Sequence, residues 1–212
     1  MKRAPMNTGR RFRLLFAGIL VLCLGAPGPA QQGTKDGELA RILGKMDAVS
    51  KGFRSFRANF SQKQYTAVLR EFSAPDAGEF YYARAKDGSV RMRHEIVSPG
   101  KRILTIQGDT LTVYRPSIKE AQTASREKMR DVVGYLALGI GESSARLREK
   151  FDISYKGAET LDGVRCAVLV FVPKEAKTKS YVASITLWLK ESTTTPAQYK
   201  FEEPSEDYLL IR

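Results

Sequence analysis

Residues 78–124 constrain the fold most, because short alternating runs there are separated by turn signals. Asp-Gly at 87–88, Ser-Pro-Gly at 98–100 and Gly-Asp at 108–109 divide runs of aromatic, β-branched and charged residues. Such closely spaced runs are typical of antiparallel strands joined by tight turns. The segment therefore predicts five strands of one antiparallel sheet, at 78–85, 89–96, 102–107, 110–115 and 120–124.

The strand expected at 89–96 shows that one face of this sheet is apolar. Side chains alternate between the two faces of a strand. One face of this strand receives Val90, Met92, His94 and Ile96, and the other receives Arg91, Arg93 and Glu95. An antiparallel sheet with one packed and one wet face fits this alternation.

The strand expected at 78–85 carries an unusual arginine. By the same alternation Phe80, Tyr82 and Arg84 share one face. A guanidinium among aromatic rings needs hydrogen-bond acceptors if it is buried. From the residues alone, a snorkelling or salt-bridged surface arginine is the favoured interpretation.

The remaining segments predict helices before and within a β-rich chain. Apolar residues at helical spacing indicate a helix over 36–52. The segment 55–64 is interpreted as leading into a first strand at 65–72. Ser125 is interpreted as the cap of a helix that ends near Gly139 and Gly141, followed by a short helix at 143–150. Further strands are expected at 151–155, 164–172, 181–190, 198–203 and from residue 207 onward.

These elements together predict an α+β protein. About ten strands in one antiparallel sheet must curve strongly, close or be capped, and the helices are the available cap. The described pattern contains no repeat and no heptad, so we expect residues 31–212 to form a single domain.

Residues 1–30 have the composition of a secretory signal peptide. Five basic residues precede an apolar run at 14–26, and a small-residue segment follows it. Arg10-Arg11 leaves open whether the general or the twin-arginine route is used. We therefore expect export, and a soluble protein in the periplasm. Beyond residue 30 the chain still has more basic than acidic residues, which suits an anionic surface or partner.

Catalytic and metal-binding patterns are missing from the sequence. The chain has a single histidine, His94, and only Cys166 lies beyond the signal segment. A His/Cys zinc site and a serine triad are both disfavoured, since residues 141–145 lack the final glycine of a nucleophile elbow. We expect no enzyme activity, no metal and no cofactor.

Nucleic-acid binding is also disfavoured. Aromatic and basic residues interleave at Tyr81, Tyr82 and Arg84, as in single-strand binders. However, alternation places Tyr81 on the opposite face from Tyr82 and Arg84, and the export signal argues against such a partner.

Ordered motifs give the chain a resemblance to a known family, the periplasmic outer-membrane lipoprotein carriers of the LolA type. The motifs are Ser55-Phe56-x-Ala58-x-Phe60-x-Gln62-Lys63, Gly78-x-Phe80-x-x-x-Arg84, Ser98-Pro99, Gly108-Asp109-Thr110-Leu111-x-Val113-Tyr114-x-Pro116 and Glu120-Ala121. The later half resembles the family in strand order and in residues 170–174.

This resemblance implies a half-open β-barrel formed by a strongly curved antiparallel sheet and capped by helices. It implies a monomeric carrier that shields the acyl chains of lipid-modified proteins. Its further partners would be an inner-membrane lipoprotein-releasing transporter and an outer-membrane lipoprotein acceptor. An arginine in an early strand holds the lid in that family, and Arg84 matches it by position.

This chain departs from the family pattern in two places, next to Arg84 and at the end of the chain. Ala85 replaces the proline that follows the family's arginine, and the chain stops at Arg212 before the final strands of better-known carriers. The cavity wall is assigned to Phe60, Phe80, Tyr82, Met92 and Val113, which suit a packed core equally well. A lipid- or glycolipid-binding module or sensor on the same fold is the alternative function, and an envelope hydrolase is a third.

Overall fold

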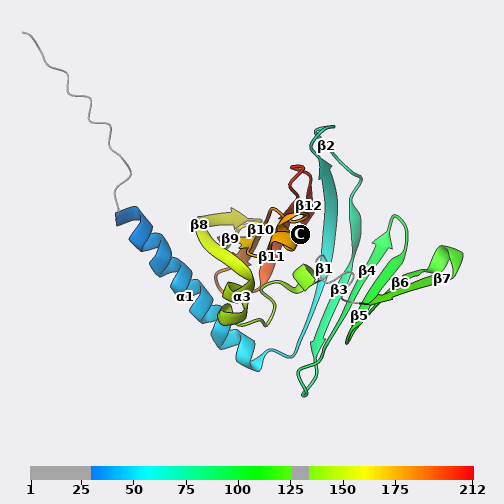
Figure 1. Cartoon of the computed structure of the whole chain (residues 1–212), viewed down its shortest axis with the longest axis horizontal. Helices are drawn as coiled ribbons and strands as arrows, with labels where there is room; N and C mark the ends of the chain where they lie inside the picture. The colour runs from blue at the N-terminus through cyan, green and yellow to red at the C-terminus, as the bar shows by residue number, and fades with distance from the viewer. Residues whose placement is uncertain (1–29, 126–133) are drawn as a thin grey trace, which may run out of the picture.

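The computed structural model describes residues 30–125 and 134–212 (Figure 1). The signal peptide expected at 1–30 and part of the helix expected after Ser125 lie outside the described residues. The helical elements are α1 (Ala30–Gly52), η1 (Pro116–Ile118), η2 (Gly134–Ala137), α3 (Ser144–Lys150) and α4 (Ala176–Lys179). The strands are β1 (Ser55–Thr66), β2 (Glu71–Phe72), β3 (Asp76–Arg84), β4 (Val90–Ser98), β5 (Arg102–Gln107), β6 (Thr110–Arg115), β7 (Glu120–Ser125), β8 (Phe151–Leu161), β9 (Val164–Pro173), β10 (Ser184–Lys190), β11 (Pro196–Glu202) and β12 (Tyr208–Ile211).

All the described strands belong to one antiparallel sheet. Its order is β7-β6-β5-β4-β3-β1-β12-β11-β10-β9-β8, and β2 pairs with β1 only. The first and last strands are therefore neighbours in the middle of the sheet, with Gln62 opposite Ile211. Figure 1 shows the two halves of the sheet turned toward each other, so the sheet is curved and open. The α+β fold with a curved antiparallel sheet and a helical cap is thus confirmed.

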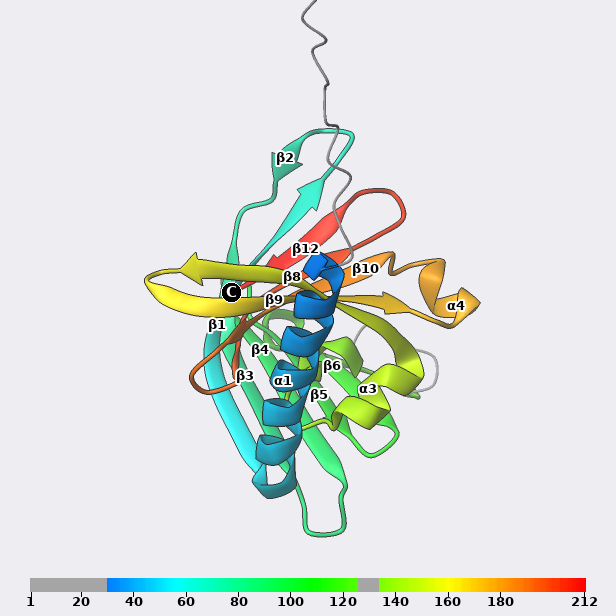
Figure 2. The ribbon, with the colours of Figure 1, turned by 90° about the vertical axis from the view of Figure 1, so that its left-hand side faces the viewer.

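The helices cover the half of the sheet that contains β8. Helix α1 crosses β8 and contacts both β8 and α3 (Figure 2). Its buried face consists of Leu39, Ile42, Leu43 and Met46. Burying this apolar stripe against the sheet stabilises a helix whose remaining surface is polar.

The strands from β3 to β7 agree with the five strands expected between residues 78 and 124. Each prediction matches a strand within two residues, and the alternation expected in β4 is present except at Glu95, which is buried. Gly78 explains one detail of β3, because a Cβ atom there would lie 1.9 Å from the Glu95 carbonyl oxygen. Only glycine permits this close approach of two paired backbones.

The first strand was predicted wrongly. Residues 55–66 form β1, and the expected strand at 65–72 is the end of a hairpin, in which Tyr65 and Thr66 pair with Phe72 and Glu71. Phe53, Phe56 and Phe60 have the three- and four-residue spacing of a helix. Phe56 and Phe60 also have the even spacing of a strand, and pairing with β3 selects the strand.

The cap expected at Ser125 is a second error. Ser125 pairs with Thr110 as the last residue of β7, and the described part of the expected helix is the 3-10 turn η2. The expected strand at 181–190 begins only at Ser184, after α4, while β8 continues to Leu161 through a bulge at Gly157.

None of the helices in residues 30–125 and 134–212 is both long enough and apolar enough to cross a bilayer.

Candidate ligand cavity and its cap

A cavity of about 420 Å³ lies between the two halves of the curved sheet. One wall comes from β1, β3 and β4, and the other comes from the β8–β9 and β10–β11 hairpins with β12. Its apolar lining consists of Phe56, Ala58, Phe60, Phe80, Ile140, Leu161, Val164, Pro196, Ala197, Tyr199 and Ile211. A volume of this size is within the range of roughly 300–1,000 Å³ that small-molecule sites occupy.

Aromatic rings form the inner wall of the cavity. The His94 ring stacks on Phe60 with 4.2 Å between centroids, and Phe80 meets it edge-on at 6.4 Å. His94 Nε2 is buried and has no hydrogen-bond partner among the described residues. Burial, reinforced by the positive charge of Arg102, lowers the pKa of His94 to about 4. The ring is therefore neutral near pH 7 and belongs to an apolar wall.

Charged side chains line the outer part of the cavity. Asp162, Lys190 and Arg212 belong to the lining, and Arg212 pairs with Asp162 at 2.6 Å. Within residues 30–125 and 134–212, the structure gives the Lys190 ammonium neither a hydrogen bond nor an ion pair, although its side chain also lines the cavity. The cavity thus combines an apolar interior with a basic rim, an arrangement that suits an amphiphile.

The residues from 134 to 150, here called the cap segment, connect the cavity to the helices. Arg84 Nη2 donates a hydrogen bond of 2.6 Å to the Gly141 carbonyl and one of 3.1 Å to Tyr82 Oη. Arg84 is half-buried at the end of β3. A charged donor to a backbone carbonyl forms a strong hydrogen bond, so β3 is tied to the cap segment here.

Gly141 adopts a conformation that suits this contact. Its φ of +62° is unfavourable for other residues, and a Cβ atom there would lie 2.5 Å from the Phe53 ring. Phe53 in turn lies 5.7 Å from the Tyr82 ring. The carbonyl that accepts from Arg84 is therefore held by close packing as well as by the hydrogen bond.

The half of the sheet that contains β8 to β12 holds the cap segment through Tyr199 of β11. Its hydroxyl donates a buried hydrogen bond of 2.8 Å to the Leu138 carbonyl. Burial raises the pKa of Tyr199, which keeps the hydroxyl protonated as a donor. Because Tyr199 also lines the cavity, one side chain touches both the cap segment and the space beneath it.

Helix α1 holds the cap segment at a third point. The Asp47 carboxylate accepts from the Ser144 backbone N–H at 2.6 Å and from its hydroxyl at 2.5 Å. These two hydrogen bonds lower the pKa of Asp47 below its ordinary value of 3.8. The carboxylate also satisfies a free N–H group in the first turn of α3.

The residues expected in the cavity wall are placed as follows. Phe60 and Phe80 line the cavity. Tyr82 and Met92 are buried on the same face of the sheet, and Val113 packs partly buried against the core, but none of these three is in the cavity lining.

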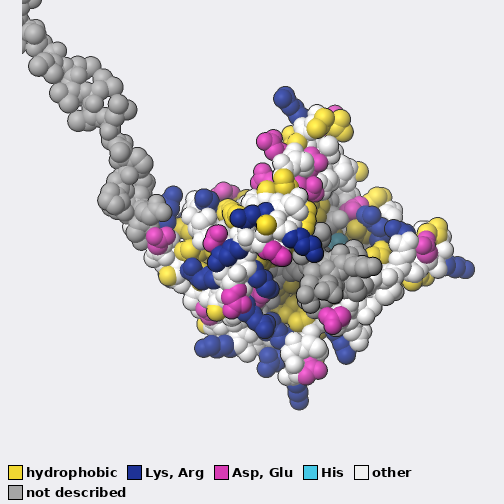
Figure 3. Space-filling model, viewed as in Figure 1, with side chains coloured by type: hydrophobic (Ala, Val, Ile, Leu, Met, Phe, Trp, Pro, Cys, Tyr) yellow, Lys and Arg dark blue, Asp and Glu magenta, His cyan; other side chains and the backbone are white. Residues whose placement is uncertain are grey.

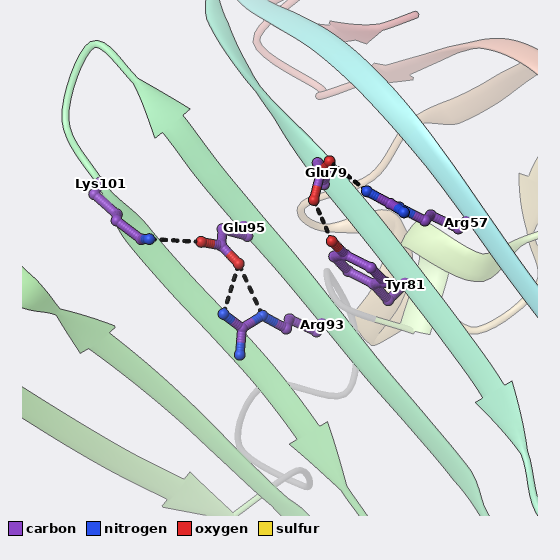
Figure 4. Close-up of polar contacts among 6 residues, drawn as sticks. All are labelled: Arg57, Glu79, Tyr81, Arg93, Glu95 and Lys101. Carbon is purple, nitrogen blue, oxygen red and sulfur yellow. Dashed lines mark hydrogen bonds and ion pairs between the residues drawn. The ribbon is translucent and has the colours of Figure 1, made fainter.

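The opposite face of β1, β3 and β4 carries paired charges (Figure 4). Two carboxylates each have two partners: Glu79 has Tyr81 and Arg57, and Glu95 has Lys101 and Arg93. These partners lower the pKa of both carboxyl groups. Because the charges are paired in this way, the face is a stable polar surface. Among the described residues, no group of three or more His, Cys, Asp or Glu residues could hold a metal.

Sequence reasoning missed Asp47, Tyr199 and Lys190. Asp47 and Tyr199 lie in a predicted helix and a predicted strand, where a polar residue gives no sign of a distant partner. The one available signal was the Ser143-Ser144 start of α3, since a serine cap attracts carboxylates as additional acceptors.

Comparisons with known proteins give similarity in fold. No protein-family model and no curated protein matches the sequence. MucB, which is known from Pseudomonas aeruginosa, matches 83% of this chain at 12% identity with a TM-score of 0.50. This chain spans 58% of the MucB chain, less than two thirds of its length.

Two further solved structures match at lower TM-scores. LprF from Mycobacterium bovis matches 84% of this chain and 91% of its own at 12% identity, with a TM-score of 0.48. A LolA superfamily protein from Nitrosomonas europaea matches 81% of this chain and 89% of its own at 15% identity, with a TM-score of 0.35. Identities this low concern the fold alone, and the fold that this chain has is an open curved antiparallel sheet with a helical cap.

Proposed function

We propose that this protein binds the acyl chains of lipids or lipid-modified proteins in the cell envelope. The observation that carries the proposal is the cavity of about 420 Å³ between the two halves of the sheet, with its apolar interior and basic rim. Acyl chains supply apolar surface to the interior, and a polar or anionic head group remains at the rim.

The finer proposal is a periplasmic carrier of lipoproteins that works between an inner-membrane transporter and an outer-membrane acceptor. Burial of each methylene group contributes about 0.8 kcal/mol, so a long chain would gain on the order of 10 kcal/mol. A carrier must release its cargo, so binding has to be offset by a cost elsewhere. Breaking the contacts that hold the cap segment closed supplies such a cost.

Arg84 is the residue to which we assign the role of latch. Its hydrogen bond to Gly141 joins β3 to the cap segment next to Ile140, which lines the cavity. A ligand that raises the cap segment must break this bond and leave a buried carbonyl without its donor. The latch therefore lowers the affinity for cargo and favours its release.

A free lipid is the second candidate ligand, and the volume of the cavity favours it. About 420 Å³ lies toward the lower end of the range for small-molecule sites, whereas a lipoprotein brings several acyl chains. A lipid-binding module or sensor would use the cavity at this size. A lipoprotein carrier would have to open it further.

Binding without catalysis is part of the proposal. His94, the one histidine of the chain, has a lowered pKa and stacks on Phe60 in the cavity wall. A general base for an esterase would need a nucleophile within hydrogen-bond reach. In the part of the chain that the structure describes, His94 Nε2 has no such partner.

Native mass spectrometry of the protein purified from envelopes tests the proposal. We expect a retained acylated protein for the carrier and a retained free lipid for the module. The variant Ala58→Phe places a ring in the cavity, while Ala83→Phe adds the same ring at an exposed position of the neighbouring strand. Loss of ligand in the first variant alone supports the cavity as the site.

A second filling variant, Ala197→Phe, acts from the opposite wall and covers the case in which Ala58→Phe fails to fold. Retention of ligand by both filled variants would contradict the proposal, as would an empty protein that hydrolyses an ester substrate.

A further inference from the structure

The hairpin between β1 and β2 ends in two exposed apolar side chains. Val68 is 91% exposed and Leu69 is 66% exposed, the largest values among the exposed large hydrophobic residues of the described chain. The tip, residues 67–70, projects beyond the rest of the sheet (Figures 1 and 2). Figure 3 shows apolar side chains at this projection, with a basic side chain at its end and acidic side chains along it. Exposed apolar residues next to each other at a projecting tip are a feature of interaction sites.

The tip has a defined conformation. The Arg70 N–H donates to the Ala67 carbonyl at 3.2 Å, which closes a turn around Val68 and Leu69. The Ala67 N–H donates to Asp207 Oδ1 at 2.7 Å, and this bond ties the tip to the neighbouring β11–β12 turn. The two side chains are therefore presented outward by a structured turn, so their exposure costs no further ordering when they bind.

Aromatic and basic side chains lie at the base of the tip, and we call this group the collar: Lys63, Tyr65, Phe72, Lys200 and Tyr208. Tyr65 lies 4.7 Å from Tyr208 and 5.1 Å from Phe72, measured between ring centroids. Lys63 Nζ lies 3.9 Å from the Phe72 centroid, and Lys200 Nζ lies 4.4 Å from that of Tyr208. Amphipathic rings and long cationic side chains are the groups that settle at the level of lipid head groups.

The acidic residues near the collar outnumber its basic ones. Glu71 is exposed beside Arg70, Glu202 pairs with Lys200 at 3.0 Å, Asp207 accepts from the Ala67 N–H, and Glu203 and Glu206 are exposed in the β11–β12 turn. The tip therefore has no net electrostatic attraction to an anionic surface. Insertion of the two apolar side chains must supply most of the binding.

The size of the tip decides between a bilayer and a protein partner. A stable protein interface buries roughly 800 Å² on each partner. Two side chains on a convex turn offer far less than this area. A bilayer requires no complementary surface, and apolar groups at its interface gain from burial at any position.

We propose that residues 67–70 insert into the interfacial layer of a lipid bilayer, with the aromatic and basic collar at the level of the head groups. This inference goes beyond the proposed function, because it concerns a surface outside the cavity lining and does not depend on what the cavity holds. Binding through one small tip is weak and reversible, which suits repeated contact with a membrane.

Sedimentation with vesicles of phosphatidylethanolamine and phosphatidylglycerol tests the proposal. The protein is expressed from the full sequence and purified as the host processes it. We expect Val68→Ser with Leu69→Ser to lower the partition coefficient roughly 10- to 100-fold, since two apolar side chains are removed from the bilayer. The control, Val97→Ser with Ile118→Ser, removes two other exposed apolar side chains and should bind as the wild type does.

A dye attached at Leu69→Cys gives a second, local measurement. Cys166 is fully buried, so the introduced thiol is the accessible one in the described chain. We expect the emission of an environment-sensitive dye to shift to the blue when vesicles are added. An unchanged spectrum, or equal binding of both double variants, would overturn the proposal. A shift caused by an envelope protein in the absence of lipid would overturn it as well.

Discussion

The two halves of the sheet use their apolar faces differently. In β9 and β10, side chains such as Leu169, Phe171, Ile185 and Leu187 are completely buried. In β1, β3 and β4, the rings of Phe60, Phe80 and His94 border a cavity. The centre of β9 and β10 is therefore a filled core, whereas these rings of β1, β3 and β4 form part of the cavity wall.

The difference shows that strand pattern and packing are separate properties. Both halves have alternating apolar residues, and β10 alternates as regularly as β4. Helix α1 extends over the half that contains β8, and Tyr199 of that half also holds the cap segment. The cap segment reaches the other half through its bond to Arg84, and its residue Ile140 lines the cavity between the halves. What covers a face decides whether it becomes a core.

The largest difference in unfolding free energy is expected between the variants Phe171→Ala and Phe80→Ala. Truncation of a ring in a filled core costs about 3–5 kcal/mol of unfolding free energy, because a new cavity remains. Phe80 already borders a cavity, so its truncation enlarges an existing space and should cost distinctly less. Chemical denaturation measures both variants. Equal losses would show that the two halves are packed alike.

The next largest effect is a loss of folding stability at low pH, caused by His94 in the cavity wall. The pKa of His94 is about 4 in the folded protein against an ordinary value of 6.5. The unfolded chain therefore binds a proton at higher pH, and stability falls as the pH drops from 6.5 to 4. The loss amounts to about 3 kcal/mol.

Denaturation curves at several pH values should show this loss in the wild type. The variant His94→Leu should not show the decrease in stability between pH 6.5 and 4 that His94 causes. Carboxyl groups titrate in both proteins, so the difference between them isolates the histidine. Parallel curves for the two proteins would mean that His94 is accessible to protons in the folded state.

Loss of the guanidinium in Arg84→Leu leaves the Gly141 carbonyl without its donor. We expect the variant to fold, with a loss of about 1–3 kcal/mol, and to take up a fluorescent long-chain fatty acid. Release of this probe to acceptor vesicles should be slower, because a weaker closed state competes less with the ligand. Arg93→Leu is the matched control, since Arg93 pairs with Glu95 on the opposite face and neither residue lines the cavity. Release at the wild-type rate would refute the latch.

The smallest effect is expected for Asp47→Asn, which weakens the bond between α1 and the cap segment. Replacing a partly exposed carboxylate acceptor should cost about 1 kcal/mol. The pKa of Asp47 is lowered in the folded protein, so its contribution is present above pH 3.8 and is lost as the pH falls through the lower folded pKa. Thermal melts of both proteins above and below this pH would detect the change, and a constant difference between them would contradict it.

The strands between residues 78 and 124 could be predicted because local signals agree there. Each run alternates, and each turn carries Gly or Pro. Around Phe53, Phe56 and Phe60 the signals conflict, since the same spacing fits a helix and a strand. Pairing with β3 decides the outcome, and such pairing involves residues distant in the sequence.

The cavity itself could not be predicted from sequence. Phe60 and Phe80 alternate in the same way as Tyr82 and Met92, yet only the first two line the cavity. Its volume depends on how far the two halves of the sheet separate and on where Ile140 and Tyr199 lie. These are properties of distant contacts, and an alternating pattern is identical for a filled and an unfilled face.

The pairing of β1 with β12 has a consequence for the order of folding. The hairpins of β3 to β7 and of β8 to β11 join neighbours in sequence, but Gln62 and Ile211 meet only after nearly the whole chain is available. Contacts of such wide separation form late and slowly. During synthesis or export, both halves can acquire strands while one side of β1 still lacks its partner. Until the last strand arrives, that open edge is the part of the molecule most exposed to aggregation.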